Sequence, residues 1–226
     1  MLKNTLPGAA CLSLLIAVFS TTVFAGSLAK RSRVELKIGR WHHGSASQAI
    51  NRIGPYTVQT SAKSGGAFGT VSYTYWTREN FAVTFALSAL RLTGDSRVEF
   101  GDDQTTQFVG FSENQINVVP FVFGFKYYPL VTSPARPFFS MYAGPYIGFE
   151  AQHKVEKEIV QNSRTLNSVG SRIGGGIDVR LNRRFMLGAE AGYNFVMGFT
   201  KSLSGRDNYS GPELSFGLSL LFGKGQ

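Results

Sequence analysis

The stretch RRFMLGAEAGYNFVMGFT, Arg183–Thr200, decides the fold class of this chain. From its third position every second residue is apolar, in the order Phe185, Leu187, Ala189, Ala191, Tyr193 and Phe195. This two-residue period predicts a β-strand with one apolar face. The opposite face carries glycine, asparagine and Glu190. The segment is longer than the roughly five or six residues of a usual soluble strand. Its apolar face could therefore meet either a protein core or the lipid of a membrane.

The same alternation recurs along the chain and predicts eight strands. In each of them large apolar residues on one face alternate with a face of mostly Gly, Ala, Ser and Thr. A soluble sandwich would give water a face rich in charged residues, whereas small residues suit the crowded interior of a narrow barrel. The Phe-rich face is therefore predicted to point outward into lipid. The predicted strands are Arg33–Trp41, Ala67–Trp76, Phe81–Arg91, Gln115–Tyr128, Pro137–Ala151, Ser168–Leu181, the opening stretch, and Pro212–Phe222.

The connections between these strands alternate between short and long. The short ones are TREN, LVTSPAR and NRR, and the long ones span about 42–66, 92–114, 152–167 and 200–211. This is the pattern of an outer-membrane barrel, with tight turns on one side and long loops on the other. A sheet in lipid has to close on itself, because each unpaired backbone amide there costs several kcal/mol. Pro120 and Pro145 each remove a hydrogen-bond donor, so we expect bulges or strand ends at both.

The beginning of the chain predicts export. Lys3 provides a positive start, Gly8–Phe19 an apolar core, and Val23–Ala25 a small-residue cleavage site. The apolar run is shorter than the roughly 20 residues that span a bilayer. We therefore expect residues 1–25 to be a cleaved secretory signal and residues 26–226 to form one barrel domain. Cys11 is the single cysteine and leaves with the signal, so no disulfide, thiol nucleophile or cysteine-based zinc site is expected.

Two segments carry a resemblance to a known family. They are the hairpin GGGIDVRLNRRFMLGAEAGYNF, Gly174–Phe195, and the aromatic-ended LSFGLSLLF, Leu214–Phe222. With them the chain resembles the small eight-stranded outer-membrane β-barrel proteins, the superfamily of the OmpA transmembrane domain and OmpX. The resemblance implies an all-β, closed, antiparallel, up-and-down transmembrane barrel in a Gram-negative outer membrane. It also implies a monomer with both termini in the periplasm, whose terminal Phe222 is recognised by the barrel-assembly machinery.

The formal net charge of +9 raises the question of an anionic partner. An exported chain rarely meets nucleic acid, and its Lys and Arg form no dense basic helix or aromatic-basic motif. We therefore expect no nucleic acid. The phosphates of outer-membrane lipid and lipopolysaccharide are the expected counter-charges.

Charged residues on the inward face predict a lumen network of both signs. Paired charges of this kind can satisfy one another inside a barrel, and eight strands enclose a space that side chains just fill. The favoured interpretation is a plugged lumen with a structural or surface role. A narrow or lateral pathway for small, hydrophobic molecules is the alternative. The predicted network is Glu35, Lys37, Lys126, Arg172, Asp178, Arg180 and Glu190.

The long loops are the expected place for a surface function. Exposed aromatics among polar residues can mark a partner-binding surface, although the same residues also fit an extension of the strands above the membrane, with the aromatics at the interface belt. Both interpretations stay open for a host or surface ligand, and basic loop residues are expected to contact lipopolysaccharide phosphates. The predicted loop residues are Phe100, Phe108 and Phe111, with the basic residues Lys154, Lys157, Arg164, Lys201 and Arg206.

An enzyme that modifies lipid A is the third alternative. WHHGSASQ places His42 and His43 beside Ser45, at the outer end of the first strand. A serine hydrolase needs a histidine in hydrogen-bond reach of the serine and an acid that orients the histidine. No acid is singled out by the spacing, so no catalytic residue is assigned. Neighbouring residues on a strand point to opposite faces, so the two histidines are not expected to bind one metal ion, and no cofactor is expected.

Overall fold

The computed structural model describes residues 27–43, 48–53, 56–62, 65–102, 105–152, 163–199 and 208–223. These residues form strands joined by turns, and none of them lies in a helix long and apolar enough to cross a membrane. The strands are β1 (Ser32–His42), β2 (Gln48–Ile53), β3 (Tyr56–Ala62), β4 (Gly65–Arg78), β5 (Phe81–Asp102), β6 (Thr105–Tyr127), β7 (Ala135–Gln152), β8 (Ser163–Arg180), β9 (Phe185–Val196) and β10 (Gly211–Phe222).

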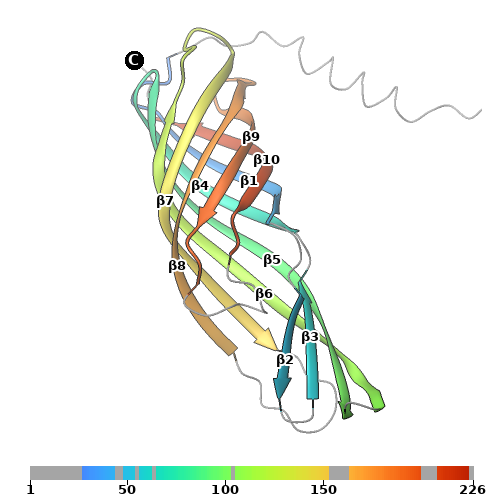
Figure 1. Ribbon diagram of the computed structural model, residues 1–226. Helices are drawn as coiled ribbons and strands as arrows, with labels where there is room; N and C mark the ends of the chain where they lie inside the picture. The colour runs from blue at the N-terminus through green and yellow to red at the C-terminus, as the bar shows by residue number, and fades with distance from the viewer. Residues whose placement is uncertain are drawn as a thin grey trace, which may run out of the picture.

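Eight of these strands close into an antiparallel barrel, as the sequence predicted (Figure 1). Each of β4 to β9 pairs with the next strand along the chain, and β1 pairs with both β4 and β10. The seam between β1 and β10 runs from Ser32 opposite Phe222 to Trp41 opposite Glu213. The start of the first strand and the end of the last strand therefore lie at the same end of the barrel. The short connections after β4, β6 and β8 also lie there, and we call it the turn end; the opposite end is the loop end.

The loop end carries a sheet that the sequence did not predict. β2 and β3 form a hairpin within the predicted loop 42–66, and β3 pairs with β5 from Tyr56 opposite Phe100 to Ala62 opposite Gly94. β5 and β6 pair as far as Asp102 and Thr105, so the predicted loop 92–114 is largely a hairpin, which agrees with the strand extension and not with a long loop. The start of β8 at Ser163 also shortens the predicted loop 152–167. In Figure 1 this four-stranded extension projects well beyond the other strands.

The barrel wall has two chemically different faces. Within the strands of the barrel, buried and exposed residues alternate, for example along β1, β4 and β10. Large apolar side chains stand on the outer surface, where the tilted rings of Phe85 and Phe123 pack against each other across β5 and β6 with centroids 4.7 Å apart. The outward faces predicted from the two-residue period carry these exposed residues, among them Leu36, Ile38, Val71, Phe121, Phe123, Phe125, Ile173, Leu187, Tyr193, Phe195, Phe216 and Leu218.

The two prolines interrupt the ladder without a bulge. Between β6 and β7 the pairing stops after Pro120 opposite Tyr146 and resumes at Phe123 opposite Ala143. Between β5 and β6 it stops after Leu87 opposite Phe121 and resumes at Leu90 opposite Val118. The register is the same on both sides of each gap, and both prolines lie within strands. The expected bulges or strand ends are therefore wrong: each proline removes a donor, and the strands on either side keep the alignment.

Apolar layers lie inside the barrel at both ends. The layer at the turn end consists of Leu28, Trp76, Ala82, Tyr128, Phe138, Met186 and Leu221. The layer toward the loop end is larger and includes Trp41, Phe68, Leu90, Ile116, Val122, Tyr142, Tyr146, Val196, Phe199 and Tyr209. The charged residues of the lumen lie between these layers.

Candidate functional site in the barrel lumen

The lumen network begins near the turn end with Arg33 on β1. Its Nη1 atom lies 2.7 Å from Oδ2 of Asp178, which comes from β8 on another part of the wall. The hydroxyl of Tyr128 donates a hydrogen bond of 2.8 Å to the same carboxylate oxygen. The Arg33 guanidinium also stacks over the ring of Trp76 at 5.2 Å. The Arg33–Asp178 pair therefore contacts two residues of the turn-end apolar layer, Trp76 and Tyr128.

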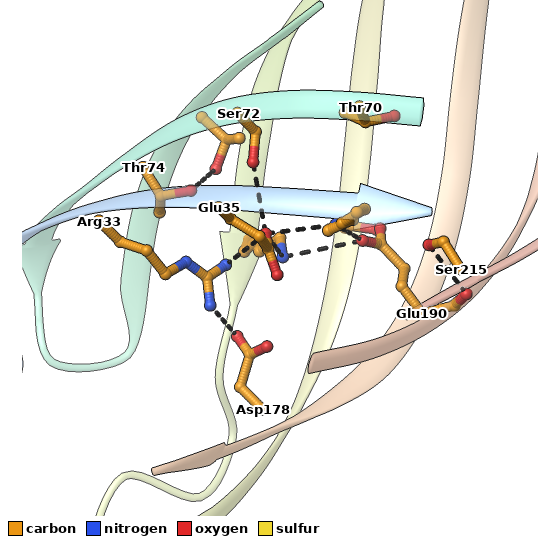
Figure 2. Close-up of polar contacts among 12 residues, drawn as sticks. Arg33, Glu35, Thr70, Ser72, Thr74, Asp178, Glu190 and Ser215 are labelled. Atoms are coloured by element: carbon orange, nitrogen blue, oxygen red, sulfur yellow. Dashed lines mark hydrogen bonds and ion pairs between the residues drawn. The ribbon is translucent and has the colours of Figure 1, made fainter. Parts of the chain in front are cut away.

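Two glutamates and two lysines occupy the middle of the lumen (Figure 2). Oε2 of Glu35 lies 3.2 Å from Arg33 Nη2 and 3.4 Å from Lys37 Nζ. Lys37 Nζ also donates to Glu190 on β9, which is two strands away from β1. Lys126 Nζ lies 3.8 Å from Glu35 and 3.7 Å from Glu190, and rests over the ring of Phe138 at 4.1 Å. Each central glutamate is therefore shared by several cations.

Arg172 continues the network toward the loop end. Its Nη2 atom lies 3.1 Å from Oε1 of Glu190 and also pairs with Oε1 of Glu213 on β10. The other oxygen of Glu213 accepts a hydrogen bond of 2.7 Å from Asn194 Nδ2, and the Tyr146 hydroxyl donates to Asn194 Oδ1 at 3.1 Å. Tyr146 belongs to the apolar layer near the loop end, so the polar chain connects the two layers.

Hydroxyl groups line the barrel wall beside the charged network. Ser72 donates to Glu35 at 3.3 Å and Ser140 to Glu190 at 2.7 Å. On β4 and β5 the hydroxyls pair across the strands, Thr70 with Ser88 and Thr74 with Thr84. Small hydroxyl side chains leave room for the long charged ones, which come mainly from the other strands. Figure 2 shows Ser72 joined to Glu35 by a dashed line, with Glu190 farther along the lumen.

The four cations and four anions of this network are all buried. Each charge has an opposite charge within the distance of an ion pair. Removing one member of such a set leaves an uncompensated charge in a poorly solvated space. The geometry therefore holds opposite walls of the barrel together and fills the lumen. A cavity of about 10 Å³, room for about one water, lies beside the network and is lined by Trp41, Phe68, Ser88, Pro120, Val122, Tyr146, Arg172, Asn194 and Glu213.

The structure brings together six of the seven predicted lumen residues. Arg180 is buried, but it lies at the turn end, where its Nε donates to the backbone oxygen of Asn182 at 3.1 Å. Arg33 and Glu213 belong to the network and were missed. The two-residue period of the strands could have identified both. Arg33 precedes the outward Val34 and Glu213 precedes the outward Leu214, so both residues fall on the inward face. Both lie at the ends of predicted strands, and neither was included in the predicted network.

The histidine pair lies at the loop end of β1. His42 is exposed, whereas His43 is buried with its ring 5.2 Å from that of Tyr209. The two side chains therefore have different surroundings, as expected for neighbours on an extended chain. Ser45 lies outside the described residues, so a serine–histidine contact stays a prediction. Among the described residues no group of three histidine, cysteine or acidic side chains is placed to hold a metal ion.

The predicted loop residues fall into two groups. The backbones of Phe100, Phe108 and Phe111 lie in the extended β5–β6 hairpin, so these residues belong to strands and not to a loop. The backbone of Arg164 lies in β8, opposite Glu150 of β7. Lys154, Lys157, Lys201 and Arg206 lie outside the described residues. A binding role for any of them stays a prediction.

The fold and the sequence together define the class of protein. A model of the outer membrane protein beta-barrel domain matches residues 11–222, so this chain belongs to that family and is an outer-membrane β-barrel protein. The resemblance to small eight-stranded outer-membrane barrels is confirmed. The exposed apolar wall is accordingly the surface that meets lipid.

Several solved structures have a similar fold. OprG of Pseudomonas aeruginosa is 11% identical, with a TM-score of 0.54, and the match covers 89% of this chain and 100% of that one. Neisserial surface protein A is 13% identical, with a TM-score of 0.53 and coverage of 86% and 98%. Ail of Yersinia pestis, solved with the heparin analogue sucrose octasulfate, is 12% identical, with a TM-score of 0.51 and coverage of 86% and 99%. At these identities the likeness shows the fold alone. No curated protein matched the sequence.

Proposed function

We propose that this protein is a monomeric structural and surface-interaction component of the outer membrane, with a plugged lumen and both termini in the periplasm. The observation that carries the proposal is the continuous ion-pair network between two apolar layers. Ion flow would require several buried pairs to separate at once, and breaking one such pair costs about 3–5 kcal/mol. The lumen is thus suited to bracing the wall and not to transport.

Planar-bilayer recording on refolded protein tests the plug. The expected result is no steady conductance above that of the lipid alone. The informative comparison is a variant in which Trp41, Tyr146 and Arg172 are replaced by alanine, which removes large side chains from the loop-end half of the lumen. Heat-modifiable gel mobility identifies the folded material in both samples. A large, steady conductance of the unmodified protein would contradict the proposal.

The loop end is the proposed surface for partners. The β2–β3 hairpin and the extended β5–β6 hairpin place four strands beyond the barrel wall, and long loops of this kind commonly carry function because they vary on a rigid scaffold. Lipopolysaccharide phosphates are the proposed partners of the basic residues Lys154, Lys157, Lys201 and Arg206. Charge reversal of all four should reduce co-purified lipopolysaccharide. The matched control is Arg78→Glu at the last residue of β4, at the turn end, and an equal loss there would contradict this assignment.

A lateral path through the wall is the second proposed function. The observation in its favour is the pair of ladder gaps around Pro120 and Pro145, next to the small cavity between Pro120 and Tyr146. Fewer hydrogen bonds hold β6 to its neighbours here, so local opening requires less free energy than elsewhere in the wall. A small apolar molecule could then pass from the loop-end half of the lumen, through the wall, into the lipid.

Restoring the missing donors tests this path. Pro120→Val and Pro145→Val together return two backbone N–H groups to the ladder, while Pro212→Val changes a proline at the start of β10. If the lateral path operates, uptake of a small apolar fluorescent dye by cells carrying the protein should fall with the double variant alone. Uptake that is the same with and without the protein would remove this second function and leave the plugged-barrel proposal standing.

A further inference from the structure

The small cavity beside the charged network is a feature of the closed barrel and not of one strand pair. Each of the eight barrel strands contributes to its lining, from Trp41 on β1 to Glu213 on β10. Its volume of about 10 Å³ has room for about one oxygen atom, either of a water molecule or of a hydroxyl group.

The polar side of the cavity offers two hydrogen-bond donors. Trp41 and Arg172 both line the cavity, and they are 2% and 5% exposed. Trp41 Nε1 and Arg172 Nε have no hydrogen-bond partner among the residues that the structure describes. Indole and guanidinium nitrogens donate and do not accept, and a buried donor that is left without an acceptor is destabilising. Both atoms therefore require an acceptor.

The side chains around these donors are held in place. The ring of Tyr146 meets that of Trp41 edge-on, with centroids 6.1 Å apart. The Tyr146 hydroxyl donates to Asn194 at 3.1 Å, and Asn194 donates to Glu213 at 2.7 Å. Glu213 in turn pairs with Arg172. Since a carboxylate oxygen accepts more than one hydrogen bond, Glu213 also provides an acceptor on this side of the cavity.

The charge of the lumen favours a neutral ligand. Arg172 is matched by Glu190 and Glu213, so an added carboxylate or ammonium would be an unpaired charge in a poorly solvated space. A pure hydrocarbon would leave both donors without an acceptor. A hydroxyl group is neutral, accepts a hydrogen bond from a donor and donates one to a carboxylate. It therefore matches the polar side of the cavity.

The other side of the cavity is apolar and borders the interrupted part of the wall. It is formed by Phe68, Pro120 and Val122. Pro120 and Ser88, which also lines the cavity, lie where the pairing of β5 with β6 is interrupted. An apolar chain attached to the hydroxyl group would therefore extend from the cavity toward this part of the wall.

We propose that the cavity binds the hydroxyl group of a small neutral alcohol, whose apolar chain lies against Phe68, Pro120 and Val122. The hydroxyl oxygen accepts from Trp41 or Arg172, and the hydroxyl hydrogen is donated to Glu213. The inference rests on the second proposed function, the lateral path, for the way in which the ligand enters. It deepens that function by naming the substrate class as alcohols, in preference to hydrocarbons.

The indole N–H signals of the two tryptophans provide a local measurement. Trp76 Nε1 lies in the turn-end layer and, within the described part of the chain, also lacks a hydrogen-bond partner. Trp76 is therefore an internal control for Trp41. Protein with isotope-labelled indole nitrogens is studied by NMR in phosphatidylcholine nanodiscs, and Trp41→Phe assigns the two signals.

Hexanol is the probe, and heptane, which has the same number of heavy atoms, is the apolar comparison. We expect a saturable downfield shift of the Trp41 signal with hexanol, because its N–H gains an acceptor, and none with heptane. The Trp76 signal should stay in place, since a general effect of the alcohol on the bilayer would move both signals.

Two serine and threonine positions on β5 provide a matched pair of variants. Ser88 and Thr84 each pair with a hydroxyl on β4, at 2.7 and 3.0 Å, and of these two Ser88 lines the cavity. Ser88→Val fills the cavity and should weaken hexanol binding at least about tenfold, whereas Thr84→Val should bind as the unmodified protein does. Val122→Ile adds a methyl group to the same cavity and replaces Ser88→Val if that variant does not fold.

The outcomes separate this site from the lateral path. No saturable shift of Trp41, equal shifts of both tryptophans, an equal response to heptane, or undiminished binding by the folded cavity-filling variant would each overturn the proposal, even where dye uptake depends on the protein. A saturable shift of Trp41 that is specific for hexanol and is lost in the cavity-filling variant supports the site. If dye uptake is then the same with and without the protein, the site stands and the lateral path alone is removed.

Discussion

Arg33 and Asp178 are 145 residues apart in the chain and meet inside the barrel, with 2.7 Å between Nη1 and Oδ2. β1 and β8 are not neighbours in the sheet, so this pair joins two parts of the wall that share no backbone hydrogen bond. The ion pair of Lys37 and Glu190 likewise joins β1 to β9, which are not neighbours in the sheet. The lumen network therefore connects parts of the wall that share no backbone hydrogen bonds.

Loss of one central anion should destabilise the folded barrel. Glu190→Gln removes the charge shared by Lys37, Lys126 and Arg172, and should lower the free energy of unfolding by about 3–5 kcal/mol. Urea unfolding in lipid vesicles measures this. Adding Lys126→Met restores the charge balance of the lumen, and the double variant should recover part of the loss. If the double variant is less stable than Glu190→Gln, charge imbalance is not the cause.

A methyl group at Gly144 should prevent normal closure of the wall. A Cβ atom there would lie 2.1 Å from the backbone oxygen of Phe121 on β6, where the ladder is already interrupted. Gly144→Ala should therefore reduce the yield of heat-modifiable, folded protein severalfold. The control is Gly69→Ala, where the nearest atom to a Cβ would be 3.9 Å away, and whose yield should match the unmodified protein. Equal yields for both variants would show that β6 and β7 can separate freely.

A charge on the outer wall should be tolerated at the strand end and not in the middle. Leu218 is exposed near the middle of β10, opposite Leu36 and Leu187. Leu218→Arg should destabilise the protein in a bilayer by about 2–4 kcal/mol, and Phe185→Arg at the start of β9 by about 0–1 kcal/mol. Unfolding in lipid vesicles measures both values. Equal effects at the two depths would argue against the assigned lipid-facing band.

Cysteine labelling should reveal which end of the barrel faces the cell exterior. Cys11 is the single cysteine and lies in the predicted signal, so Asn80→Cys and Asn208→Cys each introduce one exposed thiol in the mature chain. Asn208→Cys at the loop end should react with a membrane-impermeant maleimide on intact cells. Asn80→Cys at the turn end should react only after the outer membrane is permeabilised. The reverse pattern would place the termini outside the cell.

Strand parity was enough to predict the barrel wall and much of its lumen. A period of two assigns each residue to one face, so Lys126 and Glu190 were placed inward although they come from strands far apart in sequence. Parity does not say which inward residues meet across the lumen. Arg180 has the correct parity, but it is the last residue of β8, so its side chain lies at the turn end, where it donates to the backbone oxygen of Asn182.

The sheet beyond the barrel could not be predicted in the same way. A strand in lipid needs an apolar face, and the apolar run of β5 ends near Arg91, where the prediction ended. The backbone ladder needs no such face in water, so β5 continues to Asp102 and recruits β3 through main-chain hydrogen bonds. The two prolines were predicted only in part. The sequence predicts that each proline lacks a backbone N–H donor, but the unchanged register depends on the pairing of the residues on either side.

The seam between β1 and β10 makes closure of the barrel dependent on its last strand. Until β10 is present, β1 and β9 both expose an unpaired edge, and such edges invite pairing with other chains. Contacts between the two ends of a chain also slow folding, because a long loop has to close before any of them forms. A chain shortened by this one strand is therefore expected to aggregate, and not to form a smaller barrel.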